Sequence, residues 1–218
     1  MIAVNNEKML EDIKEAILEA DPDEVIDAID TAMKAGVPAT DILGIGITDA
    51  MTKVGELWQA KEFYLPDVMA AADVTRRGAE FLKNNLDPGE STSIGTVVIG
   101  TVKGDVHNVG KDLVATFMSA TGFDVYNLGE DVPADVFLDA VREHDPDIVA
   151  MSCFATNVTP VMAEITSGLV ELGVRDKTYC MIGGIAMGPE WVDKVGADIY
   201  TPDAYAAAQA AKAYVESR

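Results

Sequence analysis

Residues 95–110, GTVVIGTVKGDVHNVG, decide the fold of this chain. The first eight form a continuous run in which β-branched side chains dominate, and such runs are typical of a strand buried on both faces of a sheet. The run ends at Val102, and the loop that follows has glycine at positions 104 and 110. A strand of this kind predicts a parallel sheet, in which ligands bind beyond the carboxyl ends of the strands.

Downstream of this stretch, strand-like and helix-like segments alternate through the rest of the sequence. We expect strands near 95–102, 123–128, 147–152, 178–183 and 197–201, and helices near 109–121, 134–143, 158–172, 188–195 and 203–216. Alternation at this spacing indicates βαβ units. The prediction is an α/β fold, with a flavodoxin-like (Rossmann-type) domain and a five-stranded parallel sheet in residues 89–218.

Upstream, the first 85 residues show helical periodicity only, in four amphipathic segments that predict a small helical bundle, with a domain of residues 1–88. Asp21-Pro22 is a typical helix start, and we expect the third helix to begin at Thr40 or Asp41. The segment NNLDPGESTS, residues 84–93, is rich in turn-forming residues and has no periodicity. It is the predicted linker between an N-terminal four-helix bundle cap domain and the α/β domain.

The charge balance excludes some classes of function. The chain carries 37 acidic and 16 basic residues, a formal net charge of −21, which repels nucleic acid and anionic membranes. No apolar run approaches the roughly 18 residues of a membrane span, and the N-terminus does not resemble a signal peptide. Cys153 and Cys180 form no CxxC pair. We therefore expect a cytoplasmic protein with no nucleic-acid or membrane partner.

The loop after the first predicted strand contains one carboxylate and one imidazole, Asp105 and His107. In an extended loop, residues two apart point the same way, so Asp105 can accept a hydrogen bond from one ring nitrogen of His107. The other nitrogen is then free to act as a base or metal ligand. The bland alternative is that His107 is an ordinary loop residue.

A zinc site is disfavoured, because the only other histidine is His144, which we expect on the surface at the opposite edge of the sheet. A metal ion on His107 would have to bring most of its own coordination, as the metal of a macrocycle does. Two further loops lie at the same predicted edge as His107, one from Ser152 to Asn157 and one at Gly183-Gly184. Their small and hydroxyl residues leave room for a slender group, although glycines also simply end strands.

Together the three loops resemble the cobalamin-binding module, whose motifs are Asp-x-His-x-x-Gly, Ser-x-Leu and Gly-Gly. Here these motifs stand as residues 105–110, 152–154 and 183–184. The resemblance covers nearly the whole chain, because the methyl-carrying members of this family also have a helical cap before the module. Overall similarity is greatest to the corrinoid carriers of trimethylamine and quaternary-amine systems, and methanol and methoxyaryl carriers share the layout.

The resemblance implies a role for each motif. His107 would ligate cobalt, which makes it the metal ligand, and Asp105 would tune it through a hydrogen bond. These two are the predicted catalytic residues. Trp58 and Leu65 of the helical domain would cover the upper face of the corrin, unless both merely pack the bundle. The other predicted cofactor contacts are Val106, Asn108, Val109, Gly110, Ser152, Phe154, Thr156, Gly183, Gly184 and Asp203.

Two positions depart from the family pattern. Phe154 stands where the family usually has leucine, and this larger side chain would reshape the channel for the cofactor's nucleotide tail. Val158 stands where a hydroxyl residue often completes an Asp–His–hydroxyl relay. Thr156, Asn157 or Thr159 would have to replace that hydroxyl, or the relay stops at Asp105.

The function implied by the resemblance is methyl transfer in one-carbon metabolism such as methanogenesis. Cobalt(I) of cobalamin or a related corrinoid would accept a methyl group from a methylated substrate, a methylamine or quaternary amine, through a substrate-specific methyltransferase, with methylcobalamin as the intermediate. A second methyltransferase would pass the methyl group to a thiol or tetrahydropterin, and a reductive activating protein would be a further partner. The chain would be a component of this system and not a complete enzyme. The alternatives are an adenosylcobalamin-dependent mutase subunit, a cobalamin-dependent sensor and a corrinoid store.

Overall fold

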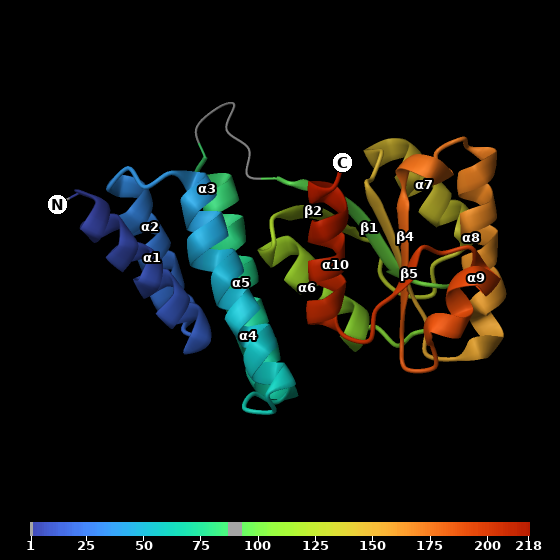
Figure 1. Ribbon diagram of the computed structural model, residues 1–218, viewed down its shortest axis with the longest axis horizontal. Coiled ribbons are helices and arrows are strands. Elements are labelled where there is room, and N and C mark those ends of the chain that lie inside the picture. The colour runs from blue at the N-terminus through green and yellow to red at the C-terminus, as the bar shows by residue number, and fades with distance from the viewer. Residues whose placement is uncertain (1, 87–92) are drawn as a thin grey trace. The chain divides into compact units, whose positions relative to one another are not determined.

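The computed structural model describes residues 2–86 and 93–218. The chain divides into two compact units, residues 1–93 with 119–122, and residues 94–118 with 123–218. The predicted domain boundary, between residues 88 and 89, and most of the predicted linker, 84–93, lie outside the described residues. The helical unit and the α/β unit each have their own layers of secondary structure (Figure 1).

The helical unit contains α1 (Ile2–Leu18), α2 (Pro22–Lys34), α4 (Asp49–Gln59) and α5 (Leu65–Asn84). Asp21 precedes α2, and its side chain accepts hydrogen bonds from the main-chain nitrogens of Asp23 and Glu24, each 3.0 Å long. Pro22 follows in the first turn, where its missing N–H costs nothing. The predicted start of the second helix is therefore confirmed. The fully buried side chains of this unit include Ile13, Ile17, Ile29, Ile42, Ile47 and Leu82.

The third predicted helix differs from the expectation in its start and in its winding. It begins with α3 (Ala39–Asp41), directly after the extended residue Pro38, and not at Thr40 or Asp41. Residues Ile42–Thr48 then form a π-helical segment, η1, that runs into α4. Gly44 and Gly46 lie in this segment, and glycine lowers the preference for the regular α-helix. The apolar spacing alone could not distinguish α from π winding.

The α/β unit is built on a five-stranded parallel sheet in the order β2-β1-β3-β4-β5. Its strands are β1 (Gly95–Thr101), β2 (Phe123–Asn127), β3 (Ile148–Ser152), β4 (Tyr179–Gly183) and β5 (Ile199–Tyr200). Thr101 pairs with Ser152, and Ser152 pairs with Gly183. The α/β fold and the parallel sheet predicted from the sequence are thus confirmed, and three strands end in register at one edge.

Helices cover both faces of this sheet. Figure 1 shows α6 (Val109–Ala120) and α10 (Ala204–Glu216) on one face, with α7 (Ala134–His144), α8 (Thr159–Glu171) and α9 (Val192–Val195) on the other. Phe137 of α7 is fully buried against β1, where a Cβ on Gly100 would lie 2.7 Å from its ring. The helix expected at 188–195 is shorter, because residues Pro189–Trp191 form a 3-10 turn before α9.

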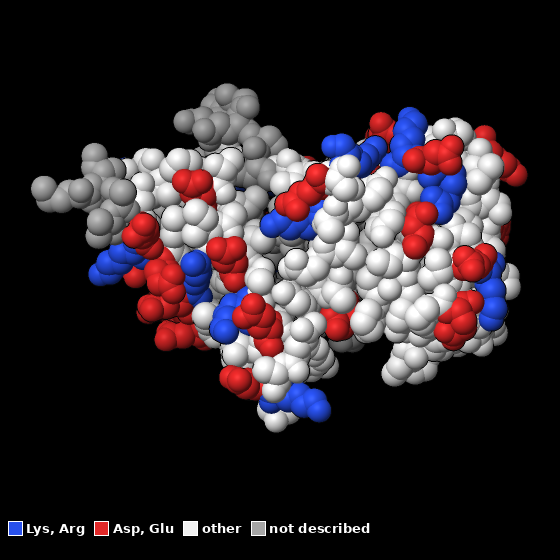
Figure 2. Space-filling view, in the orientation of Figure 1, with Lys and Arg blue, Asp and Glu red and all other residues white. Residues whose placement is uncertain are grey.

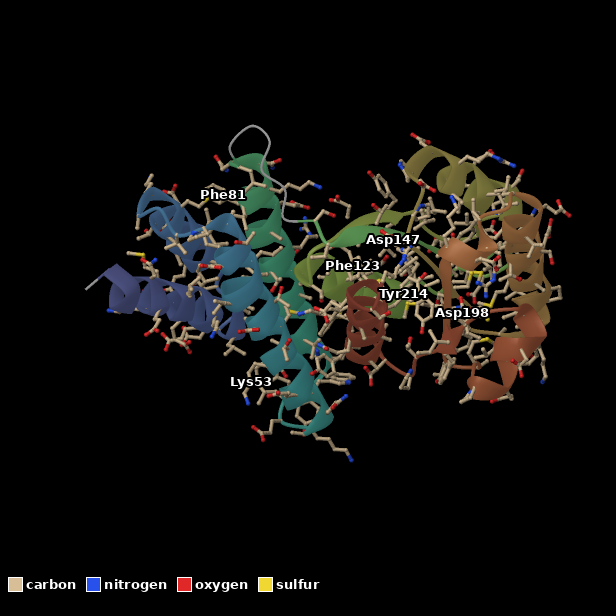
Figure 3. The ribbon with its side chains drawn as sticks, turned by 45° about the horizontal axis from the view of Figure 1, so that its top comes forward. Lys53, Phe81, Phe123, Asp147, Asp198 and Tyr214 are labelled. Atoms are coloured by element: carbon tan, nitrogen blue, oxygen red, sulfur yellow. The ribbon has the colours of Figure 1, made fainter. Side chains whose placement is uncertain are left out.

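Side-chain contacts tie the last helix to the starts of the strands. Tyr214 of α10 stacks on Tyr179, with ring centroids 4.2 Å apart. Arg218, just after α10, forms an ion pair with Asp147 at 2.6 Å. A separate ion pair, between Arg175 and Asp198 at 2.8 Å, joins the segments before β4 and β5. Figure 3 labels Tyr214, Asp147 and Asp198 among the side chains of this unit. The carboxyl edge of the sheet, where the predicted motifs lie, is formed by other residues.

Acidic side chains are prominent on the surface of the helical unit. Figure 2 shows Asp and Glu gathered over α1, a helix that carries Glu7, Glu11, Asp12 and Glu15. Within the described residues, no helix is both long enough and apolar enough to cross a membrane.

Candidate functional site

The candidate site begins in the loop between β1 and α6, where Asp105 is buried and His107 is exposed. Asp105 is 4% exposed, whereas the His107 side chain is 58% exposed. Asp105 Oδ1 accepts a hydrogen bond from the His107 main-chain nitrogen at 2.9 Å and lies 2.7 Å from His107 Nδ1. The predicted contact is present, but it arises from a turn closed by the Asp105 side chain and not from an extended loop.

The electrostatics of Asp105 favour its charged form. Burial alone would raise the pKa of this carboxyl, but hydrogen bonds from the main-chain nitrogens of Phe154 and His107, and from the His107 ring, outweigh burial and hold the pKa below its ordinary value. An ionised Asp105 accepts a hydrogen bond from Nδ1–H of the imidazole, which leaves Nε2 as the basic nitrogen. The loop therefore presents one basic imidazole nitrogen, Nε2, because the Asp105 carboxylate fixes the tautomer of the ring through Nδ1.

Phe154 brings the second predicted motif into contact with the first. Its main-chain nitrogen donates to Asp105 Oδ2. Its ring stacks on the His107 imidazole, with centroids 4.0 Å apart and an angle of 16° between the planes. The contact forms because β1 and β3 are neighbours whose ends are in register. The sequence predicted that both residues lie at one edge, but not that they stack.

A third segment, between β2 and α7, supports the same loop and was not among the predicted site residues. The Asp131 carboxylate accepts a hydrogen bond from the Gly104 nitrogen at 2.7 Å, and the Asp131 nitrogen donates to the Asp105 carbonyl at 2.9 Å. Asp131 adopts a positive φ of 55°, which is uncommon for a residue other than glycine. Its place just after β2, at the carboxyl edge of the sheet, is the sequence signal that could have indicated it.

The two glycines of the third motif differ in what they require. Gly184 has a φ of +130°, and a Cβ on it would lie 1.7 Å from the Cys153 carbonyl oxygen. A Cβ on Gly183 would meet only the Thr201 carbonyl, at an ordinary 3.6 Å. Gly184 is therefore required by the close approach of the β3 and β4 ends. The predicted channel for a nucleotide tail stays a prediction.

Four exposed apolar side chains lie in or beside the three motifs at this edge of the sheet. Val106 is 61% and Val109 55% exposed, Phe154 is 44% exposed, and Ile185, next to Gly184, is 78% exposed. Large apolar groups left in water at the ends of neighbouring strands are typical of a surface that contacts a ligand. Ile185 was not among the predicted cofactor contacts, although its position directly after the Gly-Gly motif could have indicated it.

The remaining predicted contacts of the α/β unit occupy defined places in the fold. The Asn108 carbonyl accepts from the Asp112 nitrogen and so starts α6, and Gly110 lies in the first turn with open space where a Cβ would be. Ser152 ends β3, and Thr156 is exposed at the start of the 3-10 turn Thr156–Val158. Asp203 is the N-cap of α10, and its carboxylate accepts from the Ala206 nitrogen at 2.7 Å.

The hydrogen bonds seen at Asp105 lead to main-chain amides and to His107, and not to a hydroxyl. The Thr159 hydroxyl, one candidate for the relay, donates to the Thr156 carbonyl at 2.8 Å, and Val158 is buried. Cys153 is buried beside the site, and burial together with the nearby Asp105 charge raises the pKa of its thiol to about 11. The thiol is therefore protonated at neutral pH and is a poor nucleophile.

The other histidine does not contribute to a metal centre. His144 ends α7, is half-buried, and stacks on Tyr126 with ring centroids 3.6 Å apart, so it packs against the fold more than the surface prediction implied. Within residues 2–86 and 93–218, no group of three or more His, Cys, Asp or Glu side chains could hold a metal ion. A metal ion bound through His107 needs other ligands that it brings with it.

The two predicted cap residues lie at one end of the helical unit. Trp58 is half-buried near the end of α4, and Leu65 opens α5 with 41% of its surface exposed. Tyr64 and Met69 are also exposed beside Leu65, at 67% and 48%. This end of the unit therefore presents apolar side chains to solvent, and the role of Trp58 and Leu65 over a corrin stays a prediction.

A parallel sheet with the Asp105–His107 loop at its carboxyl edge fits the class of cobalamin-binding proteins, and comparison with known proteins assigns the chain to that class. Residues 95–210 match the family described as B12 binding domain, and residues 9–83 match a second family with the same description. The chain is similar to a crystal structure of the methanol:cobalamin methyltransferase complex from Methanosarcina barkeri, with a TM-score of 0.85, 29% identity, and coverage of 97% of this chain and 81% of that one.

Relatives narrow this class. The trimethylamine corrinoid protein of Methanosarcina barkeri is 37% identical over 96% of this chain and 97% of its own length. Dimethylamine corrinoid protein 3 of Methanosarcina acetivorans is 34% identical over 94% of this chain and 96% of its own length. The chain therefore belongs to the family of B12-binding corrinoid proteins, and its cofactor is cobalamin or a related corrinoid.

Proposed function

We propose that this protein is the methyl carrier of a methylamine methyltransferase system, and that it holds its corrinoid through His107. The observation that carries the proposal is an exposed imidazole whose Nδ1 lies 2.7 Å from the buried Asp105 carboxylate at the carboxyl edge of a parallel sheet. This arrangement leaves Nε2 as a ligand for a metal ion approaching from solvent.

The residues of the site fit a corrinoid better than a metal ion held by protein alone. A corrin ring supplies four nitrogen ligands to its cobalt, which takes up and releases a methyl group when the cofactor is bound. The protein would then need to provide only one further ligand, and the described residues offer a single imidazole, held by Asp105, without a cluster of other ligands. The exposed side chains of Val106, Val109, Phe154 and Ile185 supply apolar contact area beside that ligand.

Each part of the site has a separate task in this proposal. Asp105 keeps Nδ1 protonated, so that Nε2 donates to cobalt, and the Asp131 contacts hold the loop in place. Trp58 and Leu65, with the exposed apolar residues beside Leu65, would shield a bound cofactor from water. Gly183, Ser152 and Thr156 leave space at the strand ends for the nucleotide tail.

The methyl donor we propose is a methylamine or a quaternary amine, and the partners are two methyltransferases. Similarity of 34% to 37% to trimethylamine and dimethylamine corrinoid proteins over nearly the whole chain supports the donor class. The likeness to a methanol:cobalamin methyltransferase complex supports a partner that methylates the cofactor. The second methyltransferase acts on a thiol or tetrahydropterin, and a reductive protein restores the carrier after oxidation.

Visible spectroscopy of the reconstituted protein tests this proposal. Wild type and the matched control variant His144→Ala should take up one corrinoid and show the spectrum of an imidazole-ligated cobalt. His107→Ala should lose the ligated spectrum and bind the corrinoid more weakly. After a chemical reductant has brought the cobalt to the cobalt(I) state, addition of trimethylamine with a cognate methyltransferase should change the spectrum of wild type. A wild-type protein that takes up no corrinoid in either oxidation state would refute the function.

A further inference from the structure

We infer that Phe154 is a positioning residue that fixes the plane of the His107 imidazole, an inference that rests on the proposed function of His107 as the cobalt ligand. The two rings lie 4.0 Å apart between centroids, with 16° between their planes. Phe154 has no assigned role beyond the expected lining of the tail channel. The structure instead places its ring directly against the His107 imidazole.

A single hydrogen bond cannot hold the imidazole in one orientation. The contact between His107 Nδ1 and Asp105 Oδ1, 2.7 Å long, anchors one edge of the ring. The ring can still tilt about the line that joins these two atoms, and any tilt swings Nε2 away from its position. A flat partner against the face of the ring opposes that tilt, because tilting would separate the stacked surfaces.

Burial does not provide this restraint by itself. The His107 side chain is 58% exposed and Phe154 is 44% exposed, so neither ring is confined by a packed core on all sides. Phe154 is itself well placed to act, because its main-chain nitrogen donates to Asp105 Oδ2. One residue therefore contacts both members of the pair, through its backbone and through its ring.

The shape of the side chain matters for this task. Phenylalanine offers a planar face to the imidazole, whereas leucine, at the same position, would offer only methyl groups of similar hydrophobicity. Phe154→Leu consequently removes stacking but keeps an apolar residue, and Phe154→Tyr keeps the stack. Val170→Ala, at an exposed apolar residue of α8 away from the site, is the matched control.

The first measurement uses the protein without cofactor. Ring currents from Phe154 should shift the Hδ2 and Hε1 resonances of His107 upfield in the NMR spectrum of wild type. Phe154→Leu should move both resonances toward the values of a free imidazole, whereas Phe154→Tyr and Val170→Ala should leave them in place. The His144 resonances, shifted by Tyr126, serve as an internal control in every sample.

The second measurement uses the protein loaded with cobalt(II) corrinoid. Electron paramagnetic resonance separates cobalt with an axial nitrogen ligand from cobalt without one. The ratio of the ligated to the unligated form should fall about three- to tenfold in Phe154→Leu, the range that the loss of one aromatic pair represents, and Phe154→Tyr should restore it. Thermal unfolding of each variant checks that a lower ratio does not come from loss of the folded structure.

The outcomes separate this inference from the function on which it rests. If wild type shows nitrogen ligation that His107→Ala abolishes, while Phe154→Leu matches wild type in both measurements, then the positioning role is wrong and the proposed function stands. If wild type shows no axial nitrogen from His107, the proposed function fails, and the inference fails with it.

Discussion

At the scale of single residues, the site depends on one buried carboxylate. Asp105 accepts from the His107 nitrogen, the His107 ring and the Phe154 nitrogen, so it connects two loops that are far apart in the sequence. Hydrogen bonds to a charged acceptor contribute more to stability than those to a neutral one, because a buried ion has lost its water and depends on these donors. Asp105 therefore serves the fold as well as the imidazole.

Replacement of Asp105 tests this double role. Asp105→Asn puts an amide nitrogen where one carboxylate oxygen accepts a hydrogen bond, and we expect a loss of about 2–3 kcal/mol in the free energy of unfolding. Asp139→Asn, at an exposed ion pair with Arg142, should change it by less than about 0.5 kcal/mol. Urea unfolding of both variants measures the difference. Equal stabilities would show that the Asp105 contacts contribute nothing beyond a surface pair.

The two adjacent glycines provide a second test at the residue scale. Gly184→Ala would place a Cβ 1.7 Å from the Cys153 carbonyl oxygen at a φ of +130°, so we expect a loss of about 3 kcal/mol or more. Gly183→Ala meets its nearest atom at 3.6 Å and should cost about 1 kcal/mol or less. Thermal and urea unfolding of the pair distinguish them, and similar losses in both variants would contradict the geometry.

The buried thiol of Cys180 should make the free energy of unfolding fall at alkaline pH. Burial raises the pKa of this thiol from 9.0 to about 12. The protonated thiol therefore lowers stability at no pH below 9. Between pH 9 and pH 12 the free energy of unfolding falls, because in that window only the unfolded state ionises. At pH 10 the loss should be about 1.4 kcal/mol. Urea unfolding at pH 7 and pH 10 should show a smaller decrease for Cys180→Ala than for wild type, and the same decrease in both would exclude this cause.

At the scale of the elements, strong local patterns predicted the structure well and weak ones did not. The β-branched run became β1, and the Asp21-Pro22 start became the N-terminus of α2, because both depend on the residues within the element. The π-helical winding of Ile42–Thr48 and the short α9 were not predicted. Both depend on how a short segment packs, which its own periodicity does not report.

Helix α10 allows the roles proposed for Asp203 to be separated. Its carboxylate accepts from the Ala206 nitrogen at 2.7 Å, so Asp203→Ala should lower the free energy of unfolding by about 1 kcal/mol. Asp203→Asn should retain most of the stability, because asparagine also caps helices well. Urea unfolding measures this, alongside corrinoid uptake. If Asn loses corrinoid affinity while it keeps stability, Asp203 contacts the cofactor as well as capping the helix.

At the scale of the whole molecule, the excess of acidic residues should make the protein more stable in salt. With 37 acidic and 16 basic residues, self-repulsion is stronger than the attraction within exposed ion pairs, and salt screens both. We expect the melting temperature to rise by about 2–4 °C between low salt and 0.5 M NaCl, which corresponds to about 1 kcal/mol. Calorimetry at matched pH measures it. A lower melting temperature in salt would show that ion pairs dominate.

The sequence by itself determined the succession of strands and helices along the chain, the edge at which the three motifs meet, and the pairing of Asp105 with His107. These follow from short-range periodicity and from spacings of a few residues, together with the rule that parallel strands end at one edge. The family resemblance added the cofactor, which the matched B12 binding domain supports.

Only the tertiary structure decided the stacking of Phe154 on His107, the support of the loop by Asp131, and the contact that excludes a side chain at Gly184. These contacts join residues that follow different strands of the sheet, and their geometry depends on strand register, loop turns and the φ angles of single residues. A linear pattern carries no information about such distances, because they are set by the packing of segments that lie far apart in the chain.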